Sequence, residues 1–159
     1  MSQTKFDAWL YCHENCEEAF SMVTSDLLES EQFQGLSQAA RIFYIVLATH
    51  KRTTIQKQCL YMSLTKYHKL QGDNWTKEEI KLESGQGIKK GKPIPPYFVI
   101  PEKHLKEYGY KSSYATKLKN ELIQKGFIET FAFEKGKDGY SNYNSKTPTI
   151  YKFVNKWKK

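Results

Sequence analysis

The sequence predicts an α+β fold that is mainly α, with its strands in the second half of the chain. Residues 36–52 carry an apolar stripe at helical spacing, and residues 97–157 alternate between short apolar strands and helices with glycine or proline at the joints. The chain has 159 residues, of which 39% are hydrophobic and 26% charged, as in an ordinary globular domain. These observations favour one domain with an additional N-terminal helical arm.

The first half predicts three longer helices. Residues 4–20 form the helix of the arm, and residues 22–30 are expected to be a short extended or turning segment. Ser37 can cap a second helix over residues 36–52. Its apolar residues recur at positions i, i+3, i+4 and i+7 and must face a core, namely Ala40, Phe43, Tyr44 and Leu47.

The third helix, over residues 53–70, is followed by an irregular region. The helix is expected to point Ile55, Cys59 and Met62 inward, with Leu64 as a further candidate. Thr76 can cap a short helix that ends at residue 83. Residues 84–96 contain three glycines and three prolines, so they are predicted to be an exposed connector.

The second half predicts a strand over residues 97–100, helices over 101–109 and 112–125, and strands over 127–134 and 149–157. Pro101 is expected at the first position of its helix, and Gly109 and Gly126 at the two helix ends. This is the element order of a winged helix-turn-helix, with residues 53–96 inserted after the first core helix. We therefore divide the chain into an arm of residues 1–34 and a winged-helix domain of residues 35–159.

The helix over residues 112–125 has two faces of different chemistry. Ala115, Leu118 and Leu122 share a narrow arc and are expected to pack inward. The opposite arc has hydroxyl, amide and lysine side chains and no carboxylate, since Glu121 lies to the side. Such side chains suit base edges in a major groove. The predicted base-reading residues are Ser113, Thr116, Lys117, Asn120 and Gln124. An ordinary solvated helix face is the alternative for this helix alone.

Residues around this helix and in the turn between the last two strands are predicted to contact the DNA backbone. Lysines can bind phosphates, and asparagine or tyrosine can donate hydrogen bonds to backbone or minor-groove atoms. The predicted backbone contacts are Lys111, Ser112 and Lys119 on the helix, and Lys135, Lys137, Tyr140, Asn142 and Lys146 in the wing.

The net charge of +8 is unevenly distributed along the chain. Residues 1–86 have 9 Lys or Arg and 11 Asp or Glu, whereas residues 87–159 have 16 and 6. A basic half favours a polyanionic partner over a merely solvated surface. The longest apolar run, residues 42–48, is too short to cross a bilayer, and no signal segment is recognised at the start. Three cysteines do not suit a disulfide framework, so we expect a cytoplasmic protein.

Other groups of residues could in principle form metal or phosphate-binding sites. Cys12, His13 and Cys16 suggest zinc, but no second ligand pair accompanies them, and core cysteines are favoured. The four histidines, at positions 13, 50, 68 and 104, are scattered in the sequence. The glycine-rich basic residues 85–92 lack the ending of a phosphate-binding loop, and a solvated loop is slightly favoured over a phosphate contact. We therefore expect no enzymatic activity, no metal and no cofactor.

The aromatic residues near the ends of these elements have two interpretations. Tyr108, Tyr110 and Tyr114 surround the turn between the two helices, where they can pack the turn or bind single-stranded DNA. Trp157 can stack along a nucleic-acid backbone or complete the core of the last strand. The packing interpretation is favoured for the tyrosines, and neither is favoured for Trp157.

Three segments of the chain resemble a known group of proteins: "LLESEQFQGLSQAARIFYIVL", "YFVIPEKHLKEYGYKSSYATKLKNELIQKGFIE" and "TPTIYKFVNKW". The matching positions are Leu28, Ser30, Phe33, Leu36, Ser37, Ala40, Arg41, Tyr108, Gly109 and residues 121–128. On these residues the chain resembles winged helix-turn-helix proteins, several of them replication-initiator-like, of Gram-positive phages, plasmids and integrative conjugative elements. The resemblance extends over residues 22–157 and implies a role in the replication of a mobile genetic element or its control.

The sequence therefore predicts a non-enzymatic protein that binds double-stranded DNA in replication initiation or transcriptional control. A homodimer formed through residues 4–20 and 36–48 would suit a palindromic site. Two alternatives stay open. One is a protein-interaction module or inhibitor that binds a replication or host defence protein, and the other is a single-stranded DNA-binding accessory protein.

Overall fold

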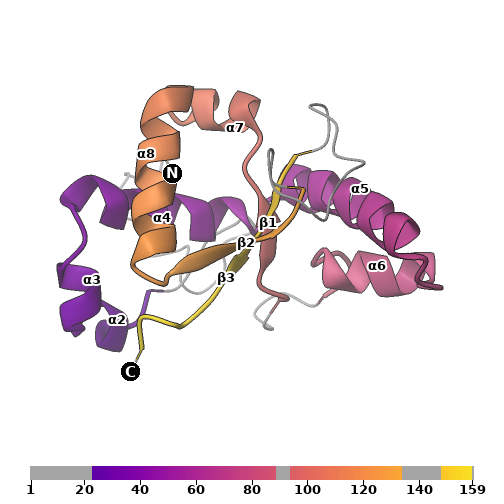
Figure 1. Ribbon diagram of the computed structural model, residues 1–159, viewed down its shortest axis with the longest axis horizontal. Helices are drawn as coiled ribbons and strands as arrows, with labels where there is room; N and C mark the ends of the chain where they lie inside the picture. The colour runs from indigo at the N-terminus through magenta and orange to yellow at the C-terminus, as the bar shows by residue number, and fades with distance from the viewer. Residues whose placement is uncertain (1–22, 89–93, 134–147, 159) are drawn as a thin grey trace, which may run out of the picture.

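The computed structural model describes residues 23–88, 94–133 and 148–158, and it has an α+β fold that is mainly helical (Figure 1). This coarse fold class confirms the prediction. The elements of the described residues are α2 (Ser25–Glu29), α3 (Glu31–Gln34), α4 (Gln38–His50), α5 (Thr54–Gln71), α6 (Lys77–Glu83), β1 (Tyr97–Val99), α7 (Glu102–Glu107), α8 (Ser112–Gln124), β2 (Ile128–Ala132) and β3 (Ile150–Phe153).

The three strands form one antiparallel sheet in which β3 lies between β1 and β2. Figure 1 shows α4, α7 and α8 at one end of this sheet and the α5–α6 hairpin at the other. Side chains of a strand alternate between two faces. Accordingly, Phe98 and Tyr151 belong to one hydrophobic cluster, whereas their neighbours Val99 and Ile150 belong to another. The sheet therefore separates two cores.

The first core lies between the sheet and helices α4, α7 and α8. The predicted stripe of α4 is confirmed, because Ala40, Phe43 and Leu47 are buried and Tyr44 packs edge-on against Phe127. The Ser37 hydroxyl accepts a hydrogen bond from the Ala40 amide and caps α4, as predicted. The apolar face of α8 closes this core from the other side.

The second core lies between the sheet and the α5–α6 hairpin. It contains Leu60 and Leu64 of α5, Ile80 of α6, and strand residues of the opposite sheet face. The predicted cap of α6 is present, and Thr76 and Glu79 form a complete capping box. Residues 53–88, which make up most of the predicted insertion, thus form mainly helices that pack on one face of the sheet.

The inward face predicted for α5 is correct at Leu64, which is buried, and at Cys59, which is half-buried and packs against the second core. It is wrong at Ile55 and Met62, which are 56% and 72% exposed. The buried face instead mixes leucines with polar side chains, namely Gln56, Ser63 and His68. The Gln56 side-chain NH2 group donates to the Val99 carbonyl at 3.0 Å, whereas its buried Oε1 atom has no hydrogen-bond partner among the described residues.

Residues 22–30 are expected to be a short extended or turning segment, but the part that the structure describes is mainly a short helix, so the extended alternative is wrong. Thr24 and Ser30 are both N-caps, and each hydroxyl accepts a hydrogen bond from an amide three residues later. Each cap begins a short helix, α2 and α3. These helices bring Phe33 into the first core, where its ring lies edge-on to Phe127.

The helix and strand boundaries of the second half lie within two residues of the prediction, apart from the end of β3. Pro101 is the N-cap of α7 and not its first residue, and β3 ends at Phe153 and not at residue 157. The predicted arm helix of residues 4–20 lies outside the described residues. The division into an arm and a domain at residue 34 stays a prediction.

Candidate nucleic-acid interface

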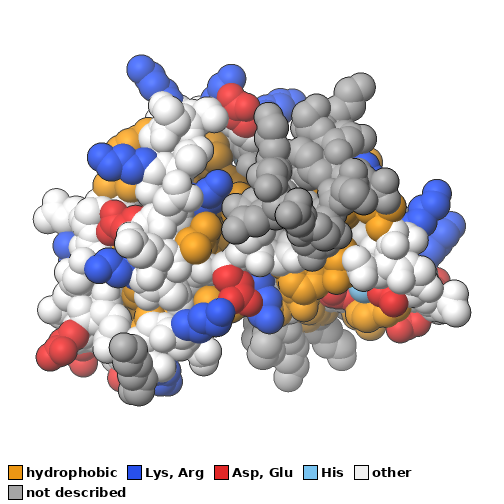
Figure 2. Space-filling model, in the orientation of Figure 1, with side chains coloured by type: hydrophobic (Ala, Val, Ile, Leu, Met, Phe, Trp, Pro, Cys, Tyr) orange, Lys and Arg blue, Asp and Glu red, His pale blue; other side chains and the backbone are white. Residues whose placement is uncertain are grey.

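Helix α8 presents its polar face to solvent, opposite the face that packs into the first core. Ala115, Leu118 and Leu122 are buried, as expected. The five predicted base-reading side chains are all exposed: Ser113, Thr116, Lys117, Asn120 and Gln124. Figure 2 shows mainly uncharged side chains over α8, with lysine or arginine side chains at its borders. Whether these side chains contact bases stays a prediction.

The single carboxylate of α8 is used within the fold. Glu121 accepts hydrogen bonds from the Ser37 amide at 2.7 Å and from the Ser37 hydroxyl at 2.9 Å. Ser37 is the N-cap of α4, so Glu121 also lies at the positive end of the α4 dipole. This contact fixes α8 against α4 and keeps negative charge away from the exposed face.

The predicted backbone-contacting residues of α8 differ in their surroundings. Lys111 and Ser112 are exposed at the beginning of the helix, where Lys111 is an N-cap without a side-chain capping bond. The first turn of α8 has no acidic residue, which suits an anion at this end. Lys119 is half-buried, with its ammonium 5.3 Å from the centre of the Tyr151 ring. Lys119 would therefore have to break this cation–π contact before it could bind a phosphate.

The turn between α7 and α8 is built around Gly109, whose φ of 88° suits glycine. The amide of Tyr110 donates to the Leu105 carbonyl at 2.9 Å, and the amide of Gly109 donates to the Lys106 carbonyl at 3.0 Å. Tyr110 packs edge-on against Phe43 of α4. The tyrosine that follows the turn is therefore part of the core packing that sets the direction of α8.

The joint from α8 to β2 requires glycine at position 126. Gly126 has a φ of 85°, and a Cβ atom there would lie 2.9 Å from the Trp157 backbone nitrogen. Trp157 donates its amide to the Gly126 carbonyl and stacks its ring on Phe127, with the ring centres 5.2 Å apart. Trp157 thus completes the first core, one of the two interpretations from the sequence.

Strands β2 and β3 form the base of a two-stranded ribbon beside α8. Ile128 pairs with Phe153, and Glu129 pairs with Lys152, before a register shift between Thr130 and Ala132. Lys156 also lies 2.6 Å from Glu129, so this carboxylate is shared by two lysines. The predicted wing contacts lie outside the described residues: Lys135, Lys137, Tyr140, Asn142 and Lys146.

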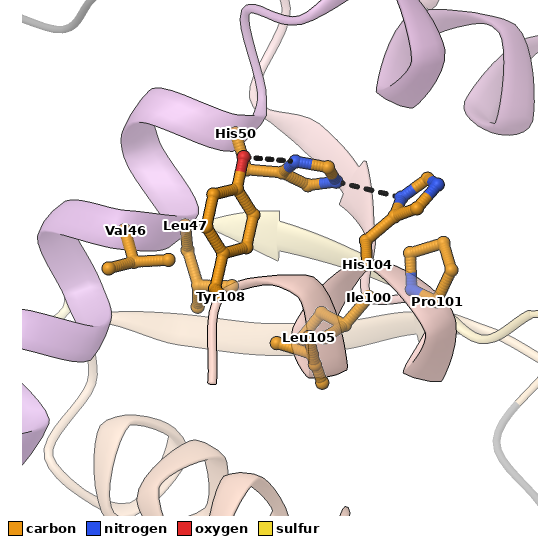
Figure 3. A pocket seen from close by; sticks show the side chains of 8 residues that line it. All are labelled: Val46, Leu47, His50, Ile100, Pro101, His104, Leu105 and Tyr108. Carbon is orange, nitrogen blue, oxygen red and sulfur yellow. Dashed lines mark hydrogen bonds between the residues drawn. The ribbon is translucent and has the colours of Figure 1, made fainter. Parts of the chain in front are cut away.

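Two of the histidines that are scattered in the sequence meet in the structure, a contact that their spacing does not predict. The His50 ring lies between the Tyr108 hydroxyl and the His104 ring, with hydrogen bonds of 3.1 Å to each (Figure 3). They adjoin a small cavity whose other walls come from Val46, Leu47, Ile100, Pro101 and Leu105. Burial, and secondarily His104, lowers the pKa of His50 to about 4. The group links the end of α4 to α7.

A third histidine forms a separate group in the α5–α6 hairpin. His68 is buried, and its two ring nitrogens lie 3.0 Å from Asp73 and 3.3 Å from Glu83. The indole of Trp75 stacks on its ring, with the centres 4.0 Å apart. Burial raises the pKa of Glu83, although His68 opposes this effect. His68 connects the end of α5 with α6, a role that histidine spacing in the sequence did not reveal.

Neither histidine group has the arrangement of a metal centre. Within residues 23–88, 94–133 and 148–158, no three His, Cys, Asp or Glu side chains are placed to hold one metal ion. Cys12, His13 and Cys16 lie outside those residues, as do residues 89–92 of the basic glycine-rich segment. No helix in the described part of the chain is long and apolar enough to span a membrane.

Comparisons of the chain with protein-family models, with curated proteins and with solved structures find no match. The resemblance to winged helix-turn-helix proteins of mobile elements therefore stays an expectation from the quoted segments.

Proposed function

We propose that the protein is a winged helix-turn-helix protein that binds double-stranded DNA, with α8 in the major groove and the β2–β3 ribbon along the adjoining backbone. The family resemblance favours a mobile genetic element as its source, and replication initiation or transcriptional control as its process. The element order from α4 to β3 supports this fold. The expected role is non-enzymatic.

One observation carries the proposal: α8 exposes hydroxyl, amide and lysine side chains, while its carboxylate is bound to Ser37. Asn120 and Gln124 have the geometry to pair with adenine, and Lys117 can donate to guanine. An exposed carboxylate on the same face would repel phosphates. Glu121 instead makes two hydrogen bonds to the N-cap of α4.

The test is a selection from a random duplex library, followed by binding measurements with variants over a range of salt concentrations. We expect the Lys117→Ala/Asn120→Ala variant to lose the selected sequence preference, with each lost base contact costing about 1–3 kcal/mol. The matched control is Lys69→Ala/Gln58→Ala, which makes similar changes on exposed positions of α5. An unchanged preference in the α8 variant would contradict the proposal.

A second candidate function is a protein-interaction role of the α5–α6 hairpin. Exposed apolar side chains favour it: Ile55, Met62 and Leu82. Size-exclusion chromatography with a replication protein of the same element would test this role, and Met62→Ser should abolish co-elution. Co-elution that is unaffected by Met62→Ser and Ile55→Ser would count against this surface.

A further inference from the structure

Tyr110 and Tyr114 form an aromatic pair at the beginning of α8, beside the proposed base-reading face. Tyr110 precedes the helix and Tyr114 lies in its first turn. Their ring planes are 21° from parallel, and the ring centres are 6.4 Å apart. Tyr114 is 46% exposed although it is a large aromatic side chain.

Contacts with the first core hold Tyr110, the inner member of the pair, in place. Phe43 is fully buried, and its ring lies edge-on to Tyr110 with the centres 5.0 Å apart. Tyr110 is further fixed by its backbone hydrogen bond to Leu105. Tyr114 therefore belongs to a row of rings that leads from the core to the surface. A ring held in this way loses little conformational freedom when it binds a ligand.

Lysines flank the exposed ring. Lys111 and Lys117 are three residues before and three residues after Tyr114, and both are exposed. Residues three apart on a helix are surface neighbours, so Lys117 lies next to the ring, and Lys111 is at the N-cap of the same turn. An exposed aromatic face beside a cation matches a nucleotide, in which a flat base is joined through its sugar to a phosphate.

From this arrangement we infer that Tyr114 stacks on an unpaired base of single-stranded DNA that adjoins the bound duplex, while Lys111 contacts a phosphate of the same strand. A base inside a duplex has both faces covered by its neighbours, so only an unpaired or terminal base offers a free face. The inference rests on the proposed function for the placement of the duplex on α8. It adds that the protein recognises a junction between duplex and single strand.

The test compares a blunt duplex with the same duplex extended by a single-stranded arm of about eight nucleotides. Fluorescence anisotropy measures both affinities, and 2-aminopurine at the first unpaired position reports stacking. We expect the wild type to bind the extended duplex about tenfold more tightly than the blunt one, with quenching of the 2-aminopurine.

Two variants at position 114 separate stacking from other contacts. Tyr114→Leu should remove the preference and the quenching, yet keep blunt-duplex affinity within about twofold. Tyr114→Phe keeps the ring and should keep both signals. Equal wild-type affinity for the two DNAs, or equal losses in both variants, would overturn the inference. Equal losses would indicate a hydrogen bond from the hydroxyl.

A failure of this inference can be distinguished from a failure of the proposed function. If α8 does not read duplex DNA, blunt-duplex binding will be insensitive to Asn120→Ala whatever happens at position 114. If only the junction inference is wrong, Asn120→Ala will still change the duplex preference, while the arm adds no affinity. Circular dichroism of each variant verifies that the helix content of the protein is unchanged.

Discussion

The two faces of the sheet are covered by helices with different buried chemistry. On the α4–α8 side, the buried positions of both long helices are almost entirely apolar. On the α5 side, the buried positions include Gln56, Ser63 and His68 beside two leucines. The apolar spacing of a sequence therefore locates the buried face of α4 and α8, but it misplaces that of α5. Hydrophobic periodicity does not recognise buried polar side chains such as Gln56 and His68, which make hydrogen bonds inside the fold.

The largest expected effect is the loss of an aromatic ring from the first core. Phe43→Ala should lower the free energy of unfolding by about 3–5 kcal/mol, because the ring is fully buried. Its sequence neighbour Ile42 is 58% exposed, so Ile42→Ala should change it by less than about 0.5 kcal/mol. Urea unfolding of both variants measures the difference. Similar losses would mean that α4 is rotated relative to the described packing.

A second pair of variants tests the corrected face of α5. Leu60→Ala should cost about 2–4 kcal/mol, because Leu60 is buried against the sheet. Met62→Ala should be nearly neutral, within about 0.5 kcal/mol, since Met62 is exposed. The same urea experiment measures both. A larger effect at Met62 than at Leu60 would restore the face expected from the apolar spacing.

The His50 group predicts a pH dependence of stability on the α4–α7 side. The pKa of His50 falls from 6.5 to about 4 on folding, so the unfolded chain binds more protons between these values. Stability contributed by this group is complete above pH 6.5 and is lost as the pH falls toward 4, by at most about 1.4 kcal/mol per pH unit.

The measurement is the difference in unfolding free energy between the wild type and His50→Gln across this range. Taking the difference removes the contribution of Lys51, whose pKa is lowered to about 7 by its own burial and by Arg52 and Lys57. The difference should shrink as the pH falls. A difference that is constant from pH 7 to pH 4 would show that His50 titrates normally.

The smallest of these effects concerns the contact between α4 and α8. Glu121→Ala removes the acceptor for two hydrogen bonds from Ser37 and should cost about 1 kcal/mol, since the site is exposed to solvent. The matched change Glu107→Ala, at an exposed position of α7, should be neutral within about 0.5 kcal/mol. Thermal unfolding of the two variants measures this. Equal midpoints would mean that Glu121 does not hold α8 in position.

Local chemistry made much of the fold predictable. Ser37 and Thr76 mark helix starts, because their hydroxyls accept hydrogen bonds from the free amides of the first turn. Gly109 and Gly126 mark helix ends, because glycine adopts the positive φ that is needed there. Both effects are local, so the sequence alone predicts them. Thr24 and Ser30 are caps of the same kind, but the helices they begin are too short to show a periodic stripe. The sequence therefore predicts only an extended or turning segment over residues 22–30.

The outward orientation of the predicted reading face followed from the pattern of α8, whereas its surroundings did not. The partner of Glu121 is 84 residues earlier in the chain, and that of His104 is 54 residues earlier. Contacts over such separations arise from tertiary packing, which spacing along one chain does not report. The same holds for the cation–π contact of Lys119 with Tyr151.

The most direct measurement of the central claim is a titration of isotope-labelled protein with duplex DNA, followed by NMR of its backbone amides. If α8 is the DNA-binding element, the amide resonances of residues 111–124 should change strongly in chemical shift, and those of α5 and α6 should not change. Shifts concentrated in residues 54–83, with α8 unchanged, would assign binding to the opposite side of the sheet and contradict the account.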